Sequence, residues 1–316
     1  MKNHFLVFFL FSSFLHSGIR AQELFPNNDP ASNVGKNVLA VRASSEFFED
    51  AGQTRSFQAY KFMFGLSSKW MLTETFSFSN HHSPRLPDGF IQHDPLGNPY
   101  TDGVKRGSPY PYLFESLDVN IKYRFLSHDS EHKHFRMAAY LDLAGGNEAH
   151  YEAEPELIGD NGGAGAGLIA TLLLHKFAAS INTGGIVPSD YTDAFSGVVI
   201  SYGKAAYLNL SLGYLVYPGT YRSYNQTNIN LYAEFQCKAY DGMVISENGK
   251  EVMIQNVPAL ESGSYVEFRP SVQFIIRSNT RIDLCVATHI YNRSWAHNDP
   301  AFFFTLQQSI FFKSKS

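Results

Sequence analysis

The sequence predicts an all-β chain that forms one closed antiparallel transmembrane β-barrel of about twelve strands. Three observations predict this fold class. Segments of alternating apolar and polar residues recur along the chain, most are longer than the strands of soluble sheets, and the connections between them alternate between short and long. We therefore expect short turns on one side of a membrane and long loops on the other.

The N-terminus is predicted to be a signal peptide over residues 1–21. Lys2 supplies the positive end, and residues 5–15 (FLVFFLFSSFL) form an apolar core too short to span a bilayer. Cleavage is expected near Ala21, and the alternative is an anchoring or buried helix. Residues 22–36, rich in Pro and Asn, are expected to be a periplasmic lead-in. The barrel is expected over residues 37–312 and a short tail over 313–316.

Composition excludes two classes of protein. The chain has 316 residues and a mean hydropathy of −0.19, and it lacks the run of roughly 20 apolar residues that a spanning helix needs. Its formal charge of −4 and the lack of a Lys/Arg run argue against a nucleic-acid partner.

Twelve segments have the pattern of spanning strands. The expected spans are residues 37–48, 54–66, 68–80, 114–127, 134–146, 163–175, 177–187, 204–217, 226–239, 264–277, 280–291 and 300–312. Most exceed the roughly 5–6 residues typical of soluble strands and match the roughly 9–11 residues of a tilted spanning strand with its ends. A periplasmic β-sandwich, the competing fold, would need strands about half as long.

The alternation within each segment assigns its two faces. In the strand expected at 264–277, Val266, Phe268 and Phe274 share one face, while Glu267 and Arg269 lie on the other. We expect the apolar face to contact lipid and the polar face to line the lumen. Glu74 breaks this rule among apolar neighbours, so we expect a β-bulge or a local change of face there.

Connection lengths support the same topology. Connections after the second, sixth and tenth strands are short, those after the fourth and eighth are moderate, and those after the third, fifth, seventh and ninth are long. Short and long connections thus fall on opposite sides, and an even strand count places both ends of the barrel in the periplasm. Residues 196–202 (SGVVISY) are expected to extend a strand or form a hairpin within a loop.

A set of charged side chains is expected to face the lumen. It comprises Arg42, Glu46, Asp118, Lys122, Arg124, Arg136, Asp142, Glu234, Lys238, Glu267, Arg269, Arg277, Arg281 and Asp283. Both signs occur on neighbouring strands. The set is therefore either a charged constriction that selects solutes or a salt-bridged filling of the barrel.

Other candidate chemistry is weak. The Pro-rich connection from His81 to Tyr112 either enters the barrel mouth or faces the medium, and its His and Asp residues match no compact metal-ligand spacing. His81, His82 and Ser83 are the nearest material for a lipid hydrolase, but their spacing does not align a Ser with a His. We expect no catalytic residue, no metal and no cofactor.

The two cysteines are expected to be free thiols. Cys237 lies on the apolar face of its strand and Cys285 on the polar face of another, so a disulfide would have to join opposite faces.

Two stretches carry a resemblance to known families. Residues 301–312 (AFFFTLQQSIFF) are similar to the C-terminal assembly signal of bacterial outer-membrane β-barrels, although the tail departs from it. Residues 210–235 and 268–276 resemble transport barrels associated with phenol meta-pathway degradation. The resemblance implies a bacterial outer-membrane protein, handled by the barrel-assembly machinery through its last strand and surrounded by outer-membrane lipid, that takes apolar or aromatic solutes.

These observations lead to one expectation and two alternatives. We expect a monomeric outer-membrane β-barrel that passes small molecules passively. The first alternative is a non-conducting structural or adhesive barrel whose long loops bind partners. The second is an outer-membrane lipid-modifying enzyme.

Overall fold

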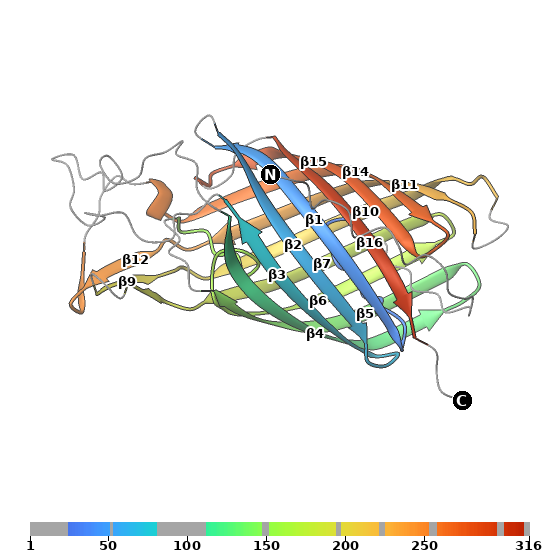
Figure 1. Ribbon diagram of the computed structural model, residues 1–316, viewed down its shortest axis with the longest axis horizontal. Coiled ribbons are helices and arrows are strands. Elements are labelled where there is room, and N and C mark those ends of the chain that lie inside the picture. Colours follow the sequence, from blue (N-terminus) through green and yellow to red (C-terminus); the bar gives the residue numbers. More distant parts are fainter. Residues whose placement is uncertain are drawn as a thin grey trace, which may run out of the picture.

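The structure is a computed structural model that describes residues 25–50, 53–80, 112–146, 152–193, 197–220, 225–252, 258–295 and 300–312. Twelve antiparallel strands close into a barrel, which confirms the predicted fold (Figure 1). β16 closes the wall by pairing with β1, from Phe311 opposite Val38 to Phe302 opposite Phe47. Closure gives every strand two neighbours, so the backbone groups of the wall are paired internally, as lipid requires.

Each expected strand matches an observed strand to within two residues at both ends. In order around the wall, the strands are β1 (Val38–Asp50), β2 (Gln53–Gly65), β3 (Trp70–Ser79), β4 (Leu113–Asp129), β5 (Lys133–Gly146), β6 (Gly163–Leu174), β7 (Phe177–Pro188), β10 (Ala205–Tyr217), β11 (Asn228–Tyr240), β14 (Gly263–Ile276), β15 (Thr280–Asn292) and β16 (Ala301–Phe311).

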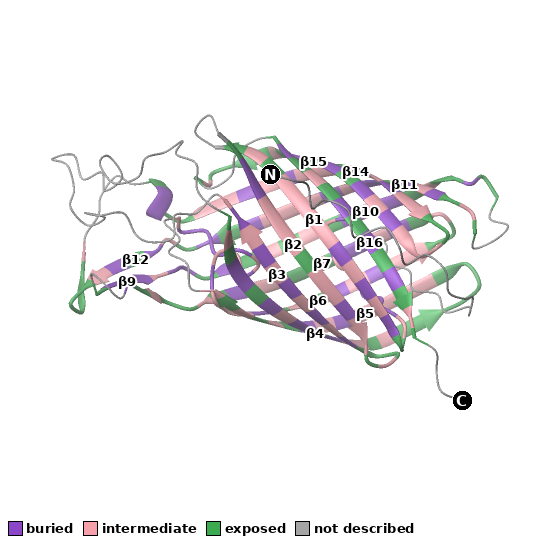
Figure 2. Cartoon of the chain, viewed as in Figure 1, coloured by how far each residue is buried: buried purple, intermediate pink, exposed green. Residues whose placement is uncertain are grey.

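The wall has an apolar outer face and a polar inner face. Burial alternates along the strands, as Figure 2 shows. On β16, Phe302 and Phe304 are exposed on the outside, whereas Thr305, Gln307 and Ser309 are buried inside. The period-two pattern of the sequence therefore assigns the two faces correctly.

Glu74 corrects one expectation. It lies on the outer face of β3, directly opposite Phe62 and Val119, and the register through it is regular. The irregularity lies further along, between Phe76 and Phe78 on the pairing with β4. The alternation of β3 is unbroken around Glu74, so its carboxylate stays on the lipid-facing side.

A second, small sheet extends beyond one end of the barrel (Figure 1). It consists of β8 (Tyr191–Thr192), β9 (Val198–Ser201), β12 (Val244–Glu247) and β13 (Lys250–Glu251), and a short 3₁₀ helix, η1 (Pro258–Leu260), follows it in sequence. Val198, Ile200 and Ile245 bury their side chains here. Part of the segment 196–202 is thus a strand within this extension and not part of the wall.

No helix in the described part of the chain has the length and apolar character needed to cross a membrane.

The chain before β1 departs from the expected arrangement. Residues 25–36, hereafter the N-terminal segment, were expected to lie in the periplasm but run inside the barrel. Phe25, Ala31 and Val34 are each at most 2% exposed. Val34 packs with Met63 and Met71, because those side chains offer it an apolar surface inside the barrel.

Candidate functional site

Basic side chains of the wall hold the backbone of the N-terminal segment. Lys122 Nζ donates hydrogen bonds to the carbonyl oxygens of Pro30 and Ser32, at 2.7 and 3.1 Å. On the opposite side of the lumen, Arg281 Nη2 donates to the Phe25 carbonyl at 3.1 Å. A segment without secondary structure has carbonyls available for such bonds, and charged donors make them strong.

Glu234 on β11 fixes two consecutive asparagines of the segment. Its carboxylate accepts from the Asn27 side-chain amide at 2.6 Å and from the Asn27 and Asn28 backbone N–H groups at 3.1 and 3.2 Å. Ser211 also donates to it, at 2.9 Å. Glu234 is fully buried, so these bonds supply the partners that a buried carboxylate requires.

Further contacts tie the middle of the segment to other strands. Asp29 Oδ1 lies 3.8 Å from Lys61 Nζ on β2. Arg136 on β5 donates to the Ser32 hydroxyl at 2.9 Å, and the Ala31 N–H donates to Thr171 on β6 at 2.9 Å. The segment is therefore attached through side chains on strands all around the barrel.

The N-terminal segment is one constriction of the lumen, and the connection between β5 and β6 forms a second one. Residues 152–162, hereafter the outer loop, are pinned by Lys238 on β11, which lies 2.9 Å from Glu154 Oε1 and 3.1 Å from Glu156 Oε2. The Tyr265 hydroxyl donates to Glu154 at 3.1 Å. The Gly159 N–H donates to Ser116 Oγ at 2.9 Å. The outer loop thus reaches both β11 and β4 across the lumen.

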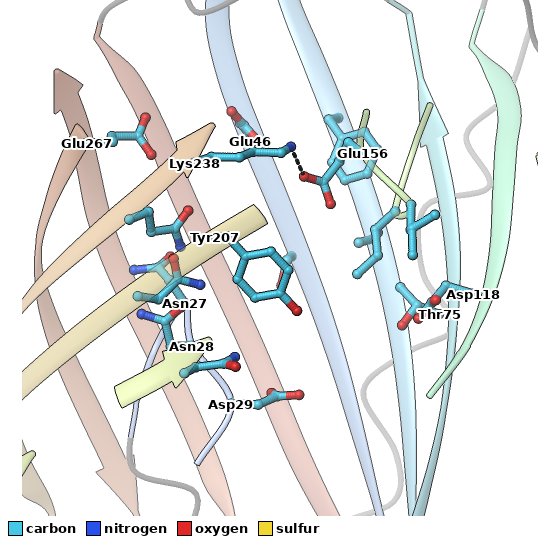
Figure 3. A pocket seen from close by; sticks show the side chains of 18 of the residues that line it. Asn27, Asn28, Asp29, Glu46, Thr75, Asp118, Glu156, Tyr207, Lys238 and Glu267 are labelled. Carbon is cyan, nitrogen blue, oxygen red and sulfur yellow. Dashed lines mark hydrogen bonds and ion pairs between the residues drawn. The ribbon is translucent and has the colours of Figure 1, made fainter. Parts of the chain in front are cut away.

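A chamber of about 740 Å³ is lined by both the N-terminal segment and the outer loop (Figure 3). Figure 3 shows Asn27, Asn28 and Asp29 on one side and the Lys238–Glu156 ion pair on another. Among the described residues that line it, carboxylates outnumber basic side chains. The carboxylates belong to Asp29, Glu46, Asp118, Asp142, Glu152, Glu154, Glu156, Asp160 and Glu267, and the basic side chains to Arg42, Lys61, Lys122, Lys238 and Arg269.

This excess of carboxylates affects the titration of the outer loop. The pKa of Asp160 lies well above its usual range, because burial disfavours the charged form and Glu156 and Glu115 add like-charge repulsion. The Asp160 carboxyl therefore stays protonated to a higher pH than an ordinary aspartate.

The predicted charged set divides into three groups. Eight residues line the chamber: Arg42, Glu46, Asp118, Lys122, Asp142, Lys238, Glu267 and Arg269. Arg136, Glu234 and Arg281 contact the N-terminal segment, and Asp283 pairs with Arg281 at 3.2 Å.

The remaining two predicted residues lie away from the chamber. Arg124 donates to the Ser68 carbonyl at the turn between β2 and β3, at 2.6 Å. Arg277 is exposed in the turn after β14, where its φ is 51°. The expectation that Arg277 faces the lumen is therefore wrong, because the strand ends one residue before it.

Sequence reasoning missed both constrictions. The Asn residues and free carbonyls of the N-terminal segment were the available signal, but they have no periodicity to identify a partner. The connection 81–111, with His81, His82 and Ser83, lies outside the described residues. So does His297. Within the described residues, no three His, Cys, Asp or Glu side chains group as metal ligands, and Cys237 and Cys285 are free.

No protein-family model matches the chain, and no curated protein matches it. Among solved structures, an outer-membrane channel from Pseudomonas putida F1 is similar, with 13% identity, a TM-score of 0.53, and coverage of 91% of this chain and 100% of that one. Two further similarities are weaker. The KdgM porin is 7% identical over 86% of this chain and 99% of that one, with a TM-score of 0.40. The NanC porin is 9% identical over 87% and 100%, with a TM-score of 0.43. At this identity, the first similarity supports the outer-membrane β-barrel fold alone.

Proposed function

We propose that this protein is a passive outer-membrane channel for small molecules whose N-terminal segment restricts the lumen. One observation carries the proposal: the segment lies inside the barrel and is held there by side chains of the wall, notably Lys122, Glu234 and Arg281. Each barrel strand is paired with two neighbours, so the wall does not need the segment to complete its backbone hydrogen bonds.

The lumen chemistry supports passage of water-soluble molecules. The inner face is polar, and the chamber is large enough for a small organic molecule. The bonds that hold the segment are exchangeable with water, because each is a hydrogen bond or ion pair in a polar lumen. Displacing the segment would therefore connect the chamber with the periplasmic end. The similarity of the fold to that of the outer-membrane channel from Pseudomonas putida F1 is consistent with a channel function.

Planar-bilayer conductance tests the proposal. We expect the full chain to give small or infrequent channel events and a deletion of residues 25–34 to give larger ones. The control is a deletion of Asn248 and Gly249 in the turn between β12 and β13, which lies outside the wall. Heat-modifiable migration on a gel would verify that every variant folds. The absence of events from both the full chain and the 25–34 deletion, at any voltage, would overturn the proposal.

A further inference from the structure

A group of oxygen-bearing side chains lies on the chamber wall formed by β3, β4 and β5. Thr75 is directly opposite Asp118, and Thr73 is directly opposite Asn120. Asn120 in turn is opposite Asp142 and donates to its Oδ1 at 2.6 Å. All five line the chamber and form what we call the oxygen cluster. Figure 3 shows Thr75 and Asp118 next to each other on this wall.

Four atoms of the oxygen cluster have no hydrogen-bond partner among the described residues: Thr73 Oγ1, Thr75 Oγ1, Asp118 Oδ2 and Asn120 Oδ1. Their residues are at most 8% exposed, and Asp118 is 2% exposed. Buried polar atoms in folded proteins nearly always have a partner, so four neighbouring exceptions on one wall indicate a ligand or water. Carboxylate and amide oxygens accept hydrogen bonds only, which favours a ligand that donates them.

The lysines on the neighbouring positions are directed to the N-terminal segment. Lys61 lies opposite Thr75 but places its Nζ 3.8 Å from Asp29. Lys122, two residues after Asn120, donates to the carbonyls of Pro30 and Ser32. Both lysines therefore contact the N-terminal segment.

The strand next to the oxygen cluster packs closely against Asp142. Gly165 on β6 is directly opposite Asp142, and a methyl group at that position would lie 3.4 Å from Asp142 Oδ2 and 3.1 Å from Leu157 Cδ1. The carboxylate thus borders an apolar side chain of the outer loop. Ile169 and Ile186 continue the apolar part of the chamber lining.

We propose that the oxygen cluster binds the ammonium group of a small amphipathic amine, whose apolar part contacts Leu157, Ile169 and Ile186. An ammonium group carries the positive charge that Asp118 and Asp142 favour, together with N–H donors for the unpartnered oxygens. The chamber volume of about 740 Å³ accommodates the organic part as well. This inference names a solute class for the proposed channel and rests on that function for its physiological meaning.

Calorimetric titration of the full chain in detergent tests the inference. Benzylamine at neutral pH is the probe, benzyl alcohol its neutral counterpart and calcium chloride the test for a metal. We expect benzylamine to bind about tenfold or more tightly than the alcohol. The ammonium group of benzylamine makes charged hydrogen bonds to the oxygen cluster, whereas the hydroxyl group of the alcohol makes only neutral ones. Asp118→Asn should weaken benzylamine binding about tenfold, and the exposed Glu247→Gln should leave it unchanged.

Two further variants keep the test decisive if Asp118→Asn folds poorly. Thr75→Val and Thr73→Val each remove one hydroxyl of the oxygen cluster and retain the wall charge; both should weaken benzylamine binding. Three outcomes would overturn the inference: the alcohol binds as tightly as the amine, calcium binds and the amine does not, or no probe binds. Binding in detergent does not require conduction. If the conductance experiment fails but benzylamine still binds, the proposed channel function is therefore rejected and the binding site is not.

Discussion

The side-chain amide nitrogen of Asn27 lies 3.4 Å from the sulfur of Cys285. The two residues are 258 positions apart in sequence, and they join the N-terminal segment to β15 inside the lumen. A cysteine of the wall thus stands beside the element that we propose to be displaced when the channel conducts.

This contact provides a reversible lock for the segment. Asn27→Cys should form a disulfide with Cys285 under oxidising conditions, and the locked chain should show fewer and smaller channel events than the same protein after reduction. Single-channel recording before and after addition of a reductant measures the change. The matched control is Asn27→Cys with Cys285→Ser, which should not respond. Identical conductance of the oxidised and reduced forms would show that passage does not require the segment to move.

Replacing the carboxylate of Glu234 should release the start of the segment. Glu234→Gln retains the size of the side chain but turns one of the two acceptor oxygens into a donor, so the bonds from either Asn27 or Asn28 are lost and the others lose their charge. Hydrogen bonds to charged groups contribute about 1.5–3 kcal/mol each, so local opening should become at least about tenfold more frequent. Amide hydrogen exchange of residues 25–36 measures this, with Glu247→Gln as the surface control. Unchanged exchange would mean that other contacts suffice to hold the segment.

Lys238 should determine whether the outer loop stays across the lumen. Lys238→Met leaves Glu154, whose side chain is 7% exposed, without its cation, and breaking a buried pair on one side costs about 3–5 kcal/mol. We expect faster proteolysis within residues 152–162 and larger conductance. The double variant Lys238→Met with Glu154→Gln should recover part of the loss, because the uncompensated charge is gone. If the double variant is as labile as the single one, the ion pair is not what fixes the loop.

Glu74 should be a site at which the barrel can be stabilised. Its carboxylate lies on the lipid-facing side of β3 between Phe62 and Val119. A charged side chain on that face is unfavourable, by up to about 2–4 kcal/mol for basic residues and by less for acidic ones. Glu74→Leu should therefore raise the unfolding midpoint in guanidinium chloride for protein folded into lipid vesicles. Glu247→Leu, outside the wall, is the comparison. A lower midpoint for Glu74→Leu would indicate that Glu74 has a polar partner at the membrane surface.

The wall could be predicted from the sequence because its signal is local. Successive side chains of a strand point to opposite faces, so the alternation seen at Phe302 to Thr305 reports both the strand and its orientation. Connection lengths add the order and direction of the strands. Both kinds of information can be found within one strand of ten to fourteen residues and the connections on either side of it.

The height of each charged residue within the barrel could not be predicted. Alternation assigns a face but not a depth, and depth depends on strand register and tilt. For this reason Glu234 and Lys238, four residues apart on one face of β11, have different roles: the first holds the N-terminal segment and the second holds the outer loop. Sequence reasoning placed them in one set, which it interpreted as either a charged constriction or a salt-bridged filling of the barrel.

The sequence by itself determined the barrel, the faces of its strands and which connections share an end of the barrel. The tertiary structure alone decided that residues 25–36 enter the lumen and that a chamber lies beside them. The physical reason is the range of the interactions involved. Strand alternation is a property of neighbouring residues, whereas the bonds from Asn27 to Glu234 and from Lys238 to Glu154 join positions 207 and 84 residues apart, which only the closed barrel brings together.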